Sequence, residues 1–426
     1  MTHAARQWRW SGRVIVGVMA LYLMAGCQAP PRVPAPPLSP PAAETALKRL
    51  EPDAYPDFTD DLDYESLERA LTLSISYLRD AAPERVFRFG PDQYDTLHVL
   101  KSLQHFQDFI RNRPSARSLQ QFIRDEFRVY RSVGRDVKAD VLYTGYYEPL
   151  LKGSLHRRLE FSYPVYPRPD DLVTIDLGLF SEKFKGETIV GRLTGGRVIP
   201  YYDRREIVED GVLYGKVEPI AWVEDPVDLF FLHIQGSGRI ALEDGRTLHL
   251  NYAAKNGRPY RSVGLLLIEE GRITRDEMSM QRIKAYLREN PFETQRVLNH
   301  NPSFIFFRIV PDGPLGALNF KLTPGRSLAL DLKLFPPAAL AFIETSKPVG
   351  DAFGRVQAWT PCHRFALNQD TGGAITGPGR ADLFWGSGPY AELAAGHLKH
   401  TGTLHFLVLK PEPGRALTEI PQASKD

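Results

Sequence analysis

The chain has 426 residues, of which 43% are hydrophobic and 24% are charged. This composition is typical of a globular protein, and it excludes a disordered acidic chain, a collagen and a coiled coil. The 53 basic and 51 acidic residues leave a net charge of +2, which gives no electrostatic footprint for nucleic acid. The two cysteines exclude a disulfide scaffold and a cysteine-rich zinc module. The length favours two or three domains.

The N-terminus has the pattern of an export signal. Three arginines precede an apolar run, Val14–Ala25, that is too short to span a bilayer comfortably as a helix. Together with the small residues after it, the run predicts a secretory signal peptide over residues 1–26. Met24-Ala25-Gly26-Cys27 resembles the bacterial lipobox, which implies a diacylglyceryl-modified Cys27. The alternative is a plain signal peptide with an incidental cysteine.

Residues 27–44 comprise this cysteine and a proline-rich segment, which predicts a semi-rigid, extended tether. Residue Gln28 stands where an aspartate would signal retention in the inner membrane, so the lipoprotein resemblance favours the outer membrane. With Cys27 lipidated, Cys362 is the only other thiol and has no disulfide partner.

Three amphipathic helices are predicted after the tether. Apolar residues recur at steps of three and four in Asp63–Arg79, in Thr96–Asn112 and in a helix that starts at Ser115. The apolar stripe of the third helix is predicted to include Phe127 and Tyr130. These faces predict a packed core rather than a cofactor site.

Short β-branched and aromatic segments follow, separated by turns rich in glycine, proline and aspartate, and they predict a barrel or a sandwich. The predicted strands are Val141–Tyr147, Tyr163–Tyr166, Gly191–Ile199, Gly211–Val217 and Phe230–Ile234. A capping box at Thr274–Glu277 predicts a helix through about Arg288, and a shorter helix covers Glu293–Asn299. Strands resume from Ser303 to Lys410, and residues 413–426 are predicted to be a loose tail.

The sequence predicts neither a metal nor a cofactor. It lacks HExxH and paired CxxC motifs, and the pair His397 and His400 has no third ligand. It also lacks the glycine-rich motifs of nucleotide sites. Gln235-Gly-Ser-Gly238 lacks the first glycine of the GxSxG serine hydrolase motif.

Carboxylates are therefore the strongest candidates for chemistry. Asp370 and Asp382 flank a glycine-rich segment, where backbone can approach a ligand closely. Phe384 and Trp385 follow, with ring faces of the kind on which sugars stack. Two turn aspartates beside a core tryptophan explain the pattern equally well. Asp370-Thr-Gly372 is also the tripeptide of aspartic peptidases, but the second copy that they need is absent.

Eight segments occur in a fixed order along the chain. They are Tyr143–Pro149, Tyr166–Leu172, Tyr201–Arg204, Asp225–Gly238, Asn256–Gly264, Met278–Met280, Asn301–Phe304 and Asp370–Gly386. Together they resemble the membrane-bound lytic murein transglycosylase A family. The C-terminal part is similar to the family's three-aspartate domain, whose acids correspond to Asp331, Asp370 and Asp382.

The resemblance implies a mainly β fold with α-helices (α+β) in two domains. Residues 45–148 and 311–412 would form a larger domain with the N-terminal helices and a double-psi β-barrel. Within it, the three-aspartate domain would cover about 315–410. Residues 149–310 would form an inserted second β-rich domain, with a groove between the two.

The family cleaves the β-1,4 bond between N-acetylmuramic acid and N-acetylglucosamine in peptidoglycan and leaves a 1,6-anhydromuramic acid end. The 6-hydroxyl of the sugar itself attacks, so a single carboxyl group serves as acid and then as base, where a hydrolase needs two. By motif position this residue is Asp382, and we expect its apolar neighbours to raise its pKa. The alternative function is a non-catalytic, peptidoglycan-binding outer-membrane lipoprotein.

The expected substrate-binding residues are Asp370, Asp331, Thr144, Tyr146, Gln235, Ser237 and Trp385. A bracing role is favoured for Asp331, and it stays open for Asp370. The expected partners are peptidoglycan glycan strands and the membrane that holds the lipid anchor, with murein synthases as candidates and no nucleic acid. A monomer on the periplasmic side of the outer membrane is expected.

Overall fold

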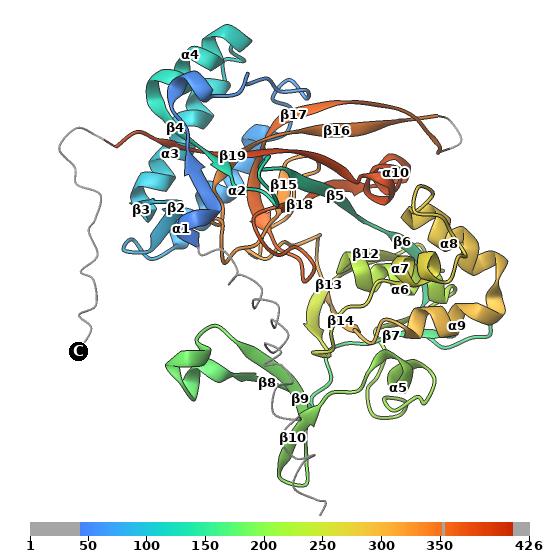
Figure 1. The fold of residues 1–426 in the computed structure, drawn as a ribbon. Helices are drawn as coiled ribbons and strands as arrows, with labels where there is room; N and C mark the ends of the chain where they lie inside the picture. Colours follow the sequence, from blue (N-terminus) through green and yellow to red (C-terminus); the bar gives the residue numbers. More distant parts are fainter. Residues whose placement is uncertain (1–42, 352–353, 412–426) are drawn as a thin grey trace, which may run out of the picture. The chain divides into compact units, whose positions relative to one another are not determined.

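Six strands close into a barrel (Figure 1). In order around the ring they are β5 (Val141–Glu148), β18 (Arg380–Ser387), β15 (Ser327–Ala329), β17 (Val356–Asp370), β16 (Leu340–Gly350) and β19 (His400–Leu409). The β5–β18 and β15–β17 pairs are parallel, and the other pairings in the ring are antiparallel. This arrangement confirms the predicted double-psi β-barrel.

The computed structural model describes residues 43–351 and 354–411. The predicted signal peptide, Cys27, almost all of the tether and the C-terminal tail lie outside these residues. Within the two described ranges, no helix has the length and apolar character that crossing a membrane requires.

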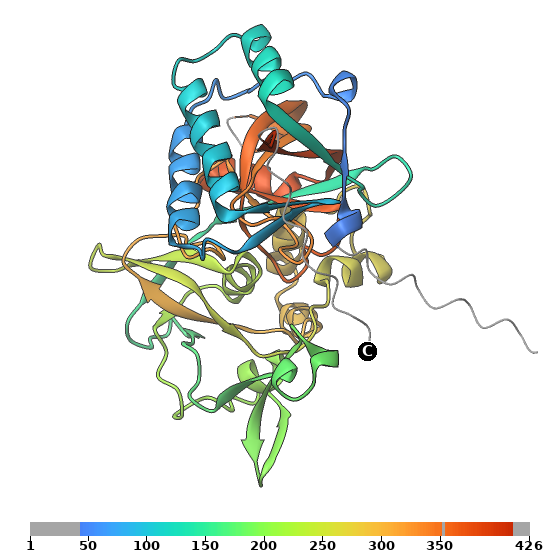
Figure 2. The same ribbon diagram turned by 90° about the vertical axis from the view of Figure 1, so that its left-hand side faces the viewer.

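Helices and two further strands extend the barrel on one side. Strand β4 (Phe127–Ser132) pairs with β19, and β1 (Leu47–Arg49) pairs with β4. The other elements here are α1 (Ala43–Ala46), α2 (Leu67–Asp80), α3 (Thr96–Ile110), α4 (Ala116–Glu126), η1 (Pro52–Ala54), β2 (Val86–Phe89) and β3 (Asp92–Asp95). Figure 2 shows α2–α4, in blue to teal, lying over the barrel strands. Their apolar faces join the barrel side chains in one buried core.

The three predicted helices are confirmed as α2, α3 and α4. Asp95 caps α3 by accepting a hydrogen bond from the backbone N–H of His98, and Ser115 caps α4 in the same way through Ser118. The apolar stripe predicted for the third helix extends beyond the C-terminal end of α4 at Glu126. Phe127 and Tyr130 lie in β4, because the pairing of this strand with β1 and β19 overrides the helical spacing.

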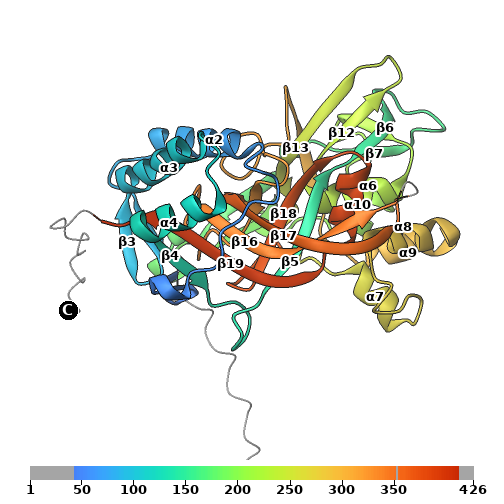
Figure 3. The same ribbon diagram turned by 90° about the horizontal axis from the view of Figure 1, so that it is seen from above.

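The inserted elements form two sheets and a group of helices beside the barrel (Figures 1 and 3). One sheet contains β14 (Ile305–Val310), β13 (Thr247–Lys255), β12 (Ser237–Leu242), β6 (Leu150–Ser154), β11 (Ala221–Val223) and β7 (Tyr163–Val165). The other contains β10 (Arg197–Pro200), β9 (Thr188–Thr194) and β8 (Leu172–Asp176). The helices are α5 (Arg204–Val208), α6 (Pro226–Gln235), α7 (Val263–Glu269), α8 (Met280–Glu289) and α9 (Pro291–Asn299), with η2 (Leu177–Leu179) and η3 (Glu182–Phe184).

Three of the predicted strands are wrong in part or in whole. The segment Phe230–Ile234 lies in α6, because a short buried apolar run does not distinguish a strand from a helix, and the cap Asp225 with Pro226 starts a helix here. The segment Gly211–Val217 forms turns. The segment Gly191–Ile199 is the β9–β10 hairpin, which turns at two consecutive glycines with positive φ.

The capping box at Thr274 and Glu277 forms, but the continuous helix starts later than predicted. Thr274 Oγ1 and Glu277 Oε2 are 2.7 Å apart, whereas α8 begins after its own cap at Ser279. The prediction of strands from Ser303 to Lys410 is wrong at α10 (Pro389–His397), which is a helix. This helix has little amphipathic pattern because its residues contact both β5 and β18 on one side and α8 on another.

The two-domain arrangement follows from these elements. We call the barrel with α1–α4 and α10 the barrel domain, and β6–β14 with α5–α9 the inserted domain. The predicted domain boundaries remain our proposal. It is supported by the end of β5 at Glu148 and the end of β14 at Val310.

Candidate active site

The register of the barrel strands brings the two central carboxyl groups together. The parallel β5–β18 pair sets Asp382 beside Thr144, and the Thr144 hydroxyl donates to Asp382 Oδ1 at 2.8 Å. On the short strand β15, Ala329 pairs with Asp382 on one side and with Asp370 on the other. Two aspartates twelve residues apart in the sequence therefore lie on strands that flank β15.

Asp382 has the electrostatics of a proton donor. Burial raises the pKa of its carboxyl group to about 6, and the negative charge of Asp370 acts in the same direction. The Thr144 hydrogen bond and the Arg380 guanidinium oppose this by stabilising the carboxylate. At near-neutral pH both protonation states are then accessible, as general acid–base catalysis requires. The raised pKa agrees with the expectation from the sequence.

Asp370 is held by three donors. The Tyr146 hydroxyl donates to Oδ2 at 2.8 Å, and the backbone N–H groups of Ala317 and Thr371 each donate to Oδ1 at 2.9 Å. Burial raises the pKa of this carboxyl group to about 6 despite these hydrogen bonds, which lower it. Its geometry supports a bracing role, since both oxygens are engaged by the protein.

Asp331 braces the glycine-rich segment. Its Oδ2 accepts the backbone N–H of Gly377 at 2.9 Å, and its Oδ1 accepts that of Lys333 at 3.1 Å. Gly377 has a φ of +80°, which favours glycine at this position. The carboxylate thus links this segment to the chain that follows β15, as favoured from the sequence.

Gln235 connects the inserted domain to the strand that carries Thr144 and Tyr146. It is the last residue of α6, and its Oε1 accepts the backbone N–H of Tyr147 on β5 at 2.9 Å. Ser237 starts β12 two residues later, buried and opposite Asn251. Gln235 thus directly contacts β5.

The rings of Phe384 and Trp385 are in the core. Their side chains are 1% and 8% exposed, so neither offers an open face to a sugar. This burial does not support the stacking role expected for Trp385, which stays a prediction. A Cβ on Gly145 would lie 2.6 Å from Trp385 Nε1, so the absence of a side chain at Gly145 allows the indole to pack against β5.

Sequence reasoning missed Arg380. Its Nη2 donates to Thr144 Oγ1 at 3.3 Å, and its charge favours the ionised form of Asp382. The signal was the two-residue spacing to Asp382, which places both side chains on one face of a strand.

The structure identifies no metal centre in the part of the chain that it describes. No group of three or more histidine, cysteine, aspartate or glutamate residues in those ranges could hold a metal ion. His397 Nδ1 lies 2.9 Å from the carbonyl oxygen of Leu393 within its own helix. Cys362 is a buried free thiol in the barrel core.

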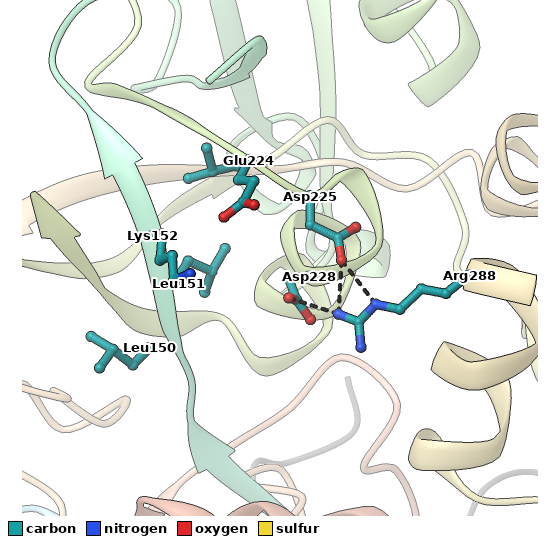
Figure 4. A pocket seen from close by; sticks show the side chains of 8 residues that line it. Leu150, Leu151, Lys152, Glu224, Asp225, Asp228 and Arg288 are labelled. Atoms are coloured by element: carbon teal, nitrogen blue, oxygen red, sulfur yellow. Dashed lines mark hydrogen bonds and ion pairs between the residues drawn. The ribbon is translucent and has the colours of Figure 1, made fainter. Parts of the chain in front are cut away.

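A cavity of about 320 Å³ lies in the inserted domain (Figure 4). It is lined by Leu150, Leu151, Lys152, Val223, Glu224, Asp225, Asp228 and Arg288. None of the predicted site residues lines it. At its edge Arg288 donates to the carboxylates of Asp225 and Asp228. The charges of these three side chains therefore compensate one another.

Two segments match known domain families. Residues 142–308 match the MltA specific insert domain, and residues 326–408 match the 3D domain. Thr144, Gln235 and Ser237 lie in the first segment, and Asp331, Asp370 and Asp382 lie in the second.

Relatives and solved structures extend this similarity over most of the chain. Membrane-bound lytic murein transglycosylase A of Escherichia coli (strain K12) is 31% identical over 343 residues, 80% of this chain and 81% of the relative. The crystal structure of a membrane-bound lytic murein transglycosylase from Agrobacterium tumefaciens is 30% identical with a TM-score of 0.69, covering 85% of this chain and 98% of that chain. E. coli MltA with bound chitohexaose is 25% identical with a TM-score of 0.65, covering 87% and 96%.

Proposed function

Since the chain belongs to the membrane-bound lytic murein transglycosylase A family, we propose that it cleaves the β-1,4 bond between N-acetylmuramic acid and N-acetylglucosamine in peptidoglycan. The product would carry a 1,6-anhydromuramic acid end. One observation carries this proposal: Asp382, a carboxyl group whose pKa burial raises to about 6, is hydrogen-bonded to Thr144. It lies in the segment that matches the 3D domain.

In the proposed mechanism a single carboxyl group performs both proton transfers. Protonated Asp382 donates to the glycosidic oxygen as the bond from that oxygen to C1 of the muramic acid breaks. The resulting carboxylate then removes the proton from the 6-hydroxyl of the same sugar, and O6 bonds to C1. Asp382 ends protonated, as it began, so no second carboxylate is needed. The intramolecular attack supplies a high effective molarity.

The neighbouring residues have supporting roles in this proposal. Thr144 orients the Asp382 carboxyl group, while the hydrogen bond from Tyr146 to Asp370 ties β5 to the end of β17. Gln235 and Ser237 of the inserted domain would bind sugar hydroxyl and N-acetyl groups in a groove between the domains. The chitohexaose bound to the E. coli relative supports a glycan as the ligand.

We also propose that Cys27 is lipidated and that it anchors the enzyme on the periplasmic side of the outer membrane. The names of the relatives, which describe them as membrane-bound, support an attachment to a membrane. The proline-rich tether would then hold the catalytic domains away from the lipid surface.

The proposed function is tested with a soluble form that lacks residues 1–27, incubated with purified murein sacculi. Mass spectrometry of the released muropeptides should find products about 18 mass units lighter than hydrolysis yields, since the intramolecular attack adds no water. Reducing-end products would instead indicate a hydrolase with a second carboxylate. Protein that pellets with sacculi but releases nothing would support the binding lipoprotein.

We expect Thr144→Val to shift the pH dependence of kcat/KM. Asp382 must be protonated to donate, so activity should fall as the pH rises through its pKa of about 6. The Thr144 hydroxyl stabilises the ionised form and thus lowers this pKa, so its removal should move the alkaline limb upward by about 1 pH unit. The measurement is a pH–rate profile on sacculi.

Thr144→Ser is the matched control, because it keeps the hydroxyl and should leave the limb in place. Asp370 also titrates near 6, so the profile reports values of the coupled pair. The direction of the shift is still diagnostic, and a downward shift in Thr144→Val would contradict the assigned role of Thr144.

A further inference from the structure

Helices α8 and α10 meet where the inserted domain contacts the barrel domain (Figures 1 and 3). Lys284 of α8 donates from Nζ to Glu392 Oε1 of α10 at 2.9 Å. The same Nζ lies 3.0 Å from Asp228 Oδ1 of α6. Lys284 is only 8% exposed, so its charge depends on these two carboxylates for compensation.

Glu392 also binds two further groups from different elements. Its backbone carbonyl accepts from Gln281 Nε2 of α8 at 2.8 Å, and its Oε1 accepts from the Tyr147 hydroxyl of β5 at 3.1 Å. Tyr147 in turn donates its backbone N–H to Gln235. Hydrogen bonds thus run continuously from α8, through Glu392 and Tyr147, to the proposed sugar-binding residue Gln235.

The opposite end of α6 is tied into the same network. Arg288 of α8 donates to Asp228 Oδ2 at 2.8 Å and to Asp225 Oδ2 at 3.0 and 2.7 Å (Figure 4). Asp225 is the N-cap of α6, and Gln235 is its last residue. Helix α6 therefore contacts α8 through Asp225 and Asp228, and α8 contacts α10 through Lys284 and Gln281.

Helix α10 belongs to the barrel domain, which also contains Asp382. It begins at Pro389, two residues after the end of β18, the strand that carries Asp382. Met280, at the start of α8, packs against the buried cores of both domains. Interfaces between domains of one chain permit relative motion unless specific contacts fix them. The hydrogen bonds to Glu392 can fix the orientation of the inserted domain relative to the barrel domain.

We propose that Lys284 and Glu392 are positioning residues that hold the inserted domain in the orientation in which Gln235 and Asp382 engage the same glycan strand. This rests on the proposed function. Both residues act through Tyr147 and α6, and neither lies among the residues that we assign to substrate contact. Breaking the pair should therefore weaken glycan binding more than it slows the chemical step.

The test measures chitohexaose affinity in an Asp382→Asn background, where no turnover interferes, and KM and kcat on murein in the otherwise unchanged enzyme. We expect Lys284→Met to weaken chitohexaose binding and to raise KM by about tenfold, with a smaller change in kcat. Glu392→Leu should do the same. The effects of the two single variants should add to more than the effect of the double variant, because both single variants lose the same Lys284–Glu392 pair.

Two controls separate positioning from a loss of folded protein. Glu392→Gln keeps a side-chain oxygen for Lys284 and Tyr147, so it should restore most of the affinity that Glu392→Leu loses. Lys185→Met removes an exposed charge of the inserted domain, whose side chain is 78% exposed, and should change nothing. Thermal unfolding of each variant gives the folded fraction.

The outcomes distinguish this proposal from the proposed function. Unchanged KM and unchanged chitohexaose affinity in Lys284→Met, with only an apparent loss of kcat that tracks the folded fraction, would overturn the positioning role. That result would leave the transglycosylase intact. Failure of the wild-type enzyme to form anhydro products would overturn the proposed function, whereas the affinity measurement would still report whether Lys284 orients a glycan site.

Discussion

Asp382→Asn should abolish the release of anhydro-muropeptides from sacculi, with a fall in kcat of at least about 10³-fold. Positioned general acids contribute about 10² to 10⁴-fold to catalysis, and Asp382 would serve both proton transfers, so both steps lose their catalyst together. Asparagine has nearly the same shape but no proton to transfer at these pH values. Muropeptides are quantified by mass spectrometry, and co-sedimentation with sacculi should remain near the wild-type level.

Asp244→Asn is the matched control for this change. Asp244 lies in the exposed turn between β12 and β13, where it pairs with Arg246, so its loss should leave turnover unchanged. Continued formation of anhydro products by Asp382→Asn would show that another residue is the general acid. Asp370, whose pKa is also about 6, would then be the next candidate.

Arg326→Met should lower the free energy of unfolding by about 3–5 kcal/mol, the usual effect of removing one partner from a buried ion pair. Arg326 is completely buried, and its two terminal nitrogens bind the two carboxylate oxygens of Asp60 at 2.6 and 2.8 Å. It also donates to the backbone carbonyls of Glu65 and Phe365. The variant leaves the buried Asp60 carboxylate without its counter-charge. Chemical denaturation followed by circular dichroism measures the change.

Arg113→Met provides the comparison at an exposed pair. Arg113 lies 3.4 Å from Asp63, and the two side chains are 70% and 80% exposed, so the expected change is at most about 1 kcal/mol. Adding Asp60→Asn to Arg326→Met should recover part of the lost stability, because it removes the unpaired charge. No recovery would indicate that the hydrogen bonds of Arg326 to the backbone carbonyls dominate.

Local sequence patterns were sufficient to predict a helix where the residues that determine it lie in one short segment. The apolar spacing predicted α3 and α4, because amphipathic packing is decided within a few residues, and the structure adds caps at Asp95 and Ser115. The same reasoning failed at Phe230–Ile234, which lies in α6 with Phe230, Phe231 and Leu232 buried. A run of buried apolar residues satisfies a central strand and a buried helix equally well.

Only the tertiary structure decided which distant residues meet. The sequence by itself determined the candidate acid, Asp382, through its motif and its glycine-rich approach. It did not determine the burial of Trp385 against Gly145, which places this ring in the barrel core. Nor did it reveal the contact of Lys284 with Glu392, which are 108 residues apart. Propensity and periodicity describe near neighbours along the chain, whereas strand register and domain packing set such pairs.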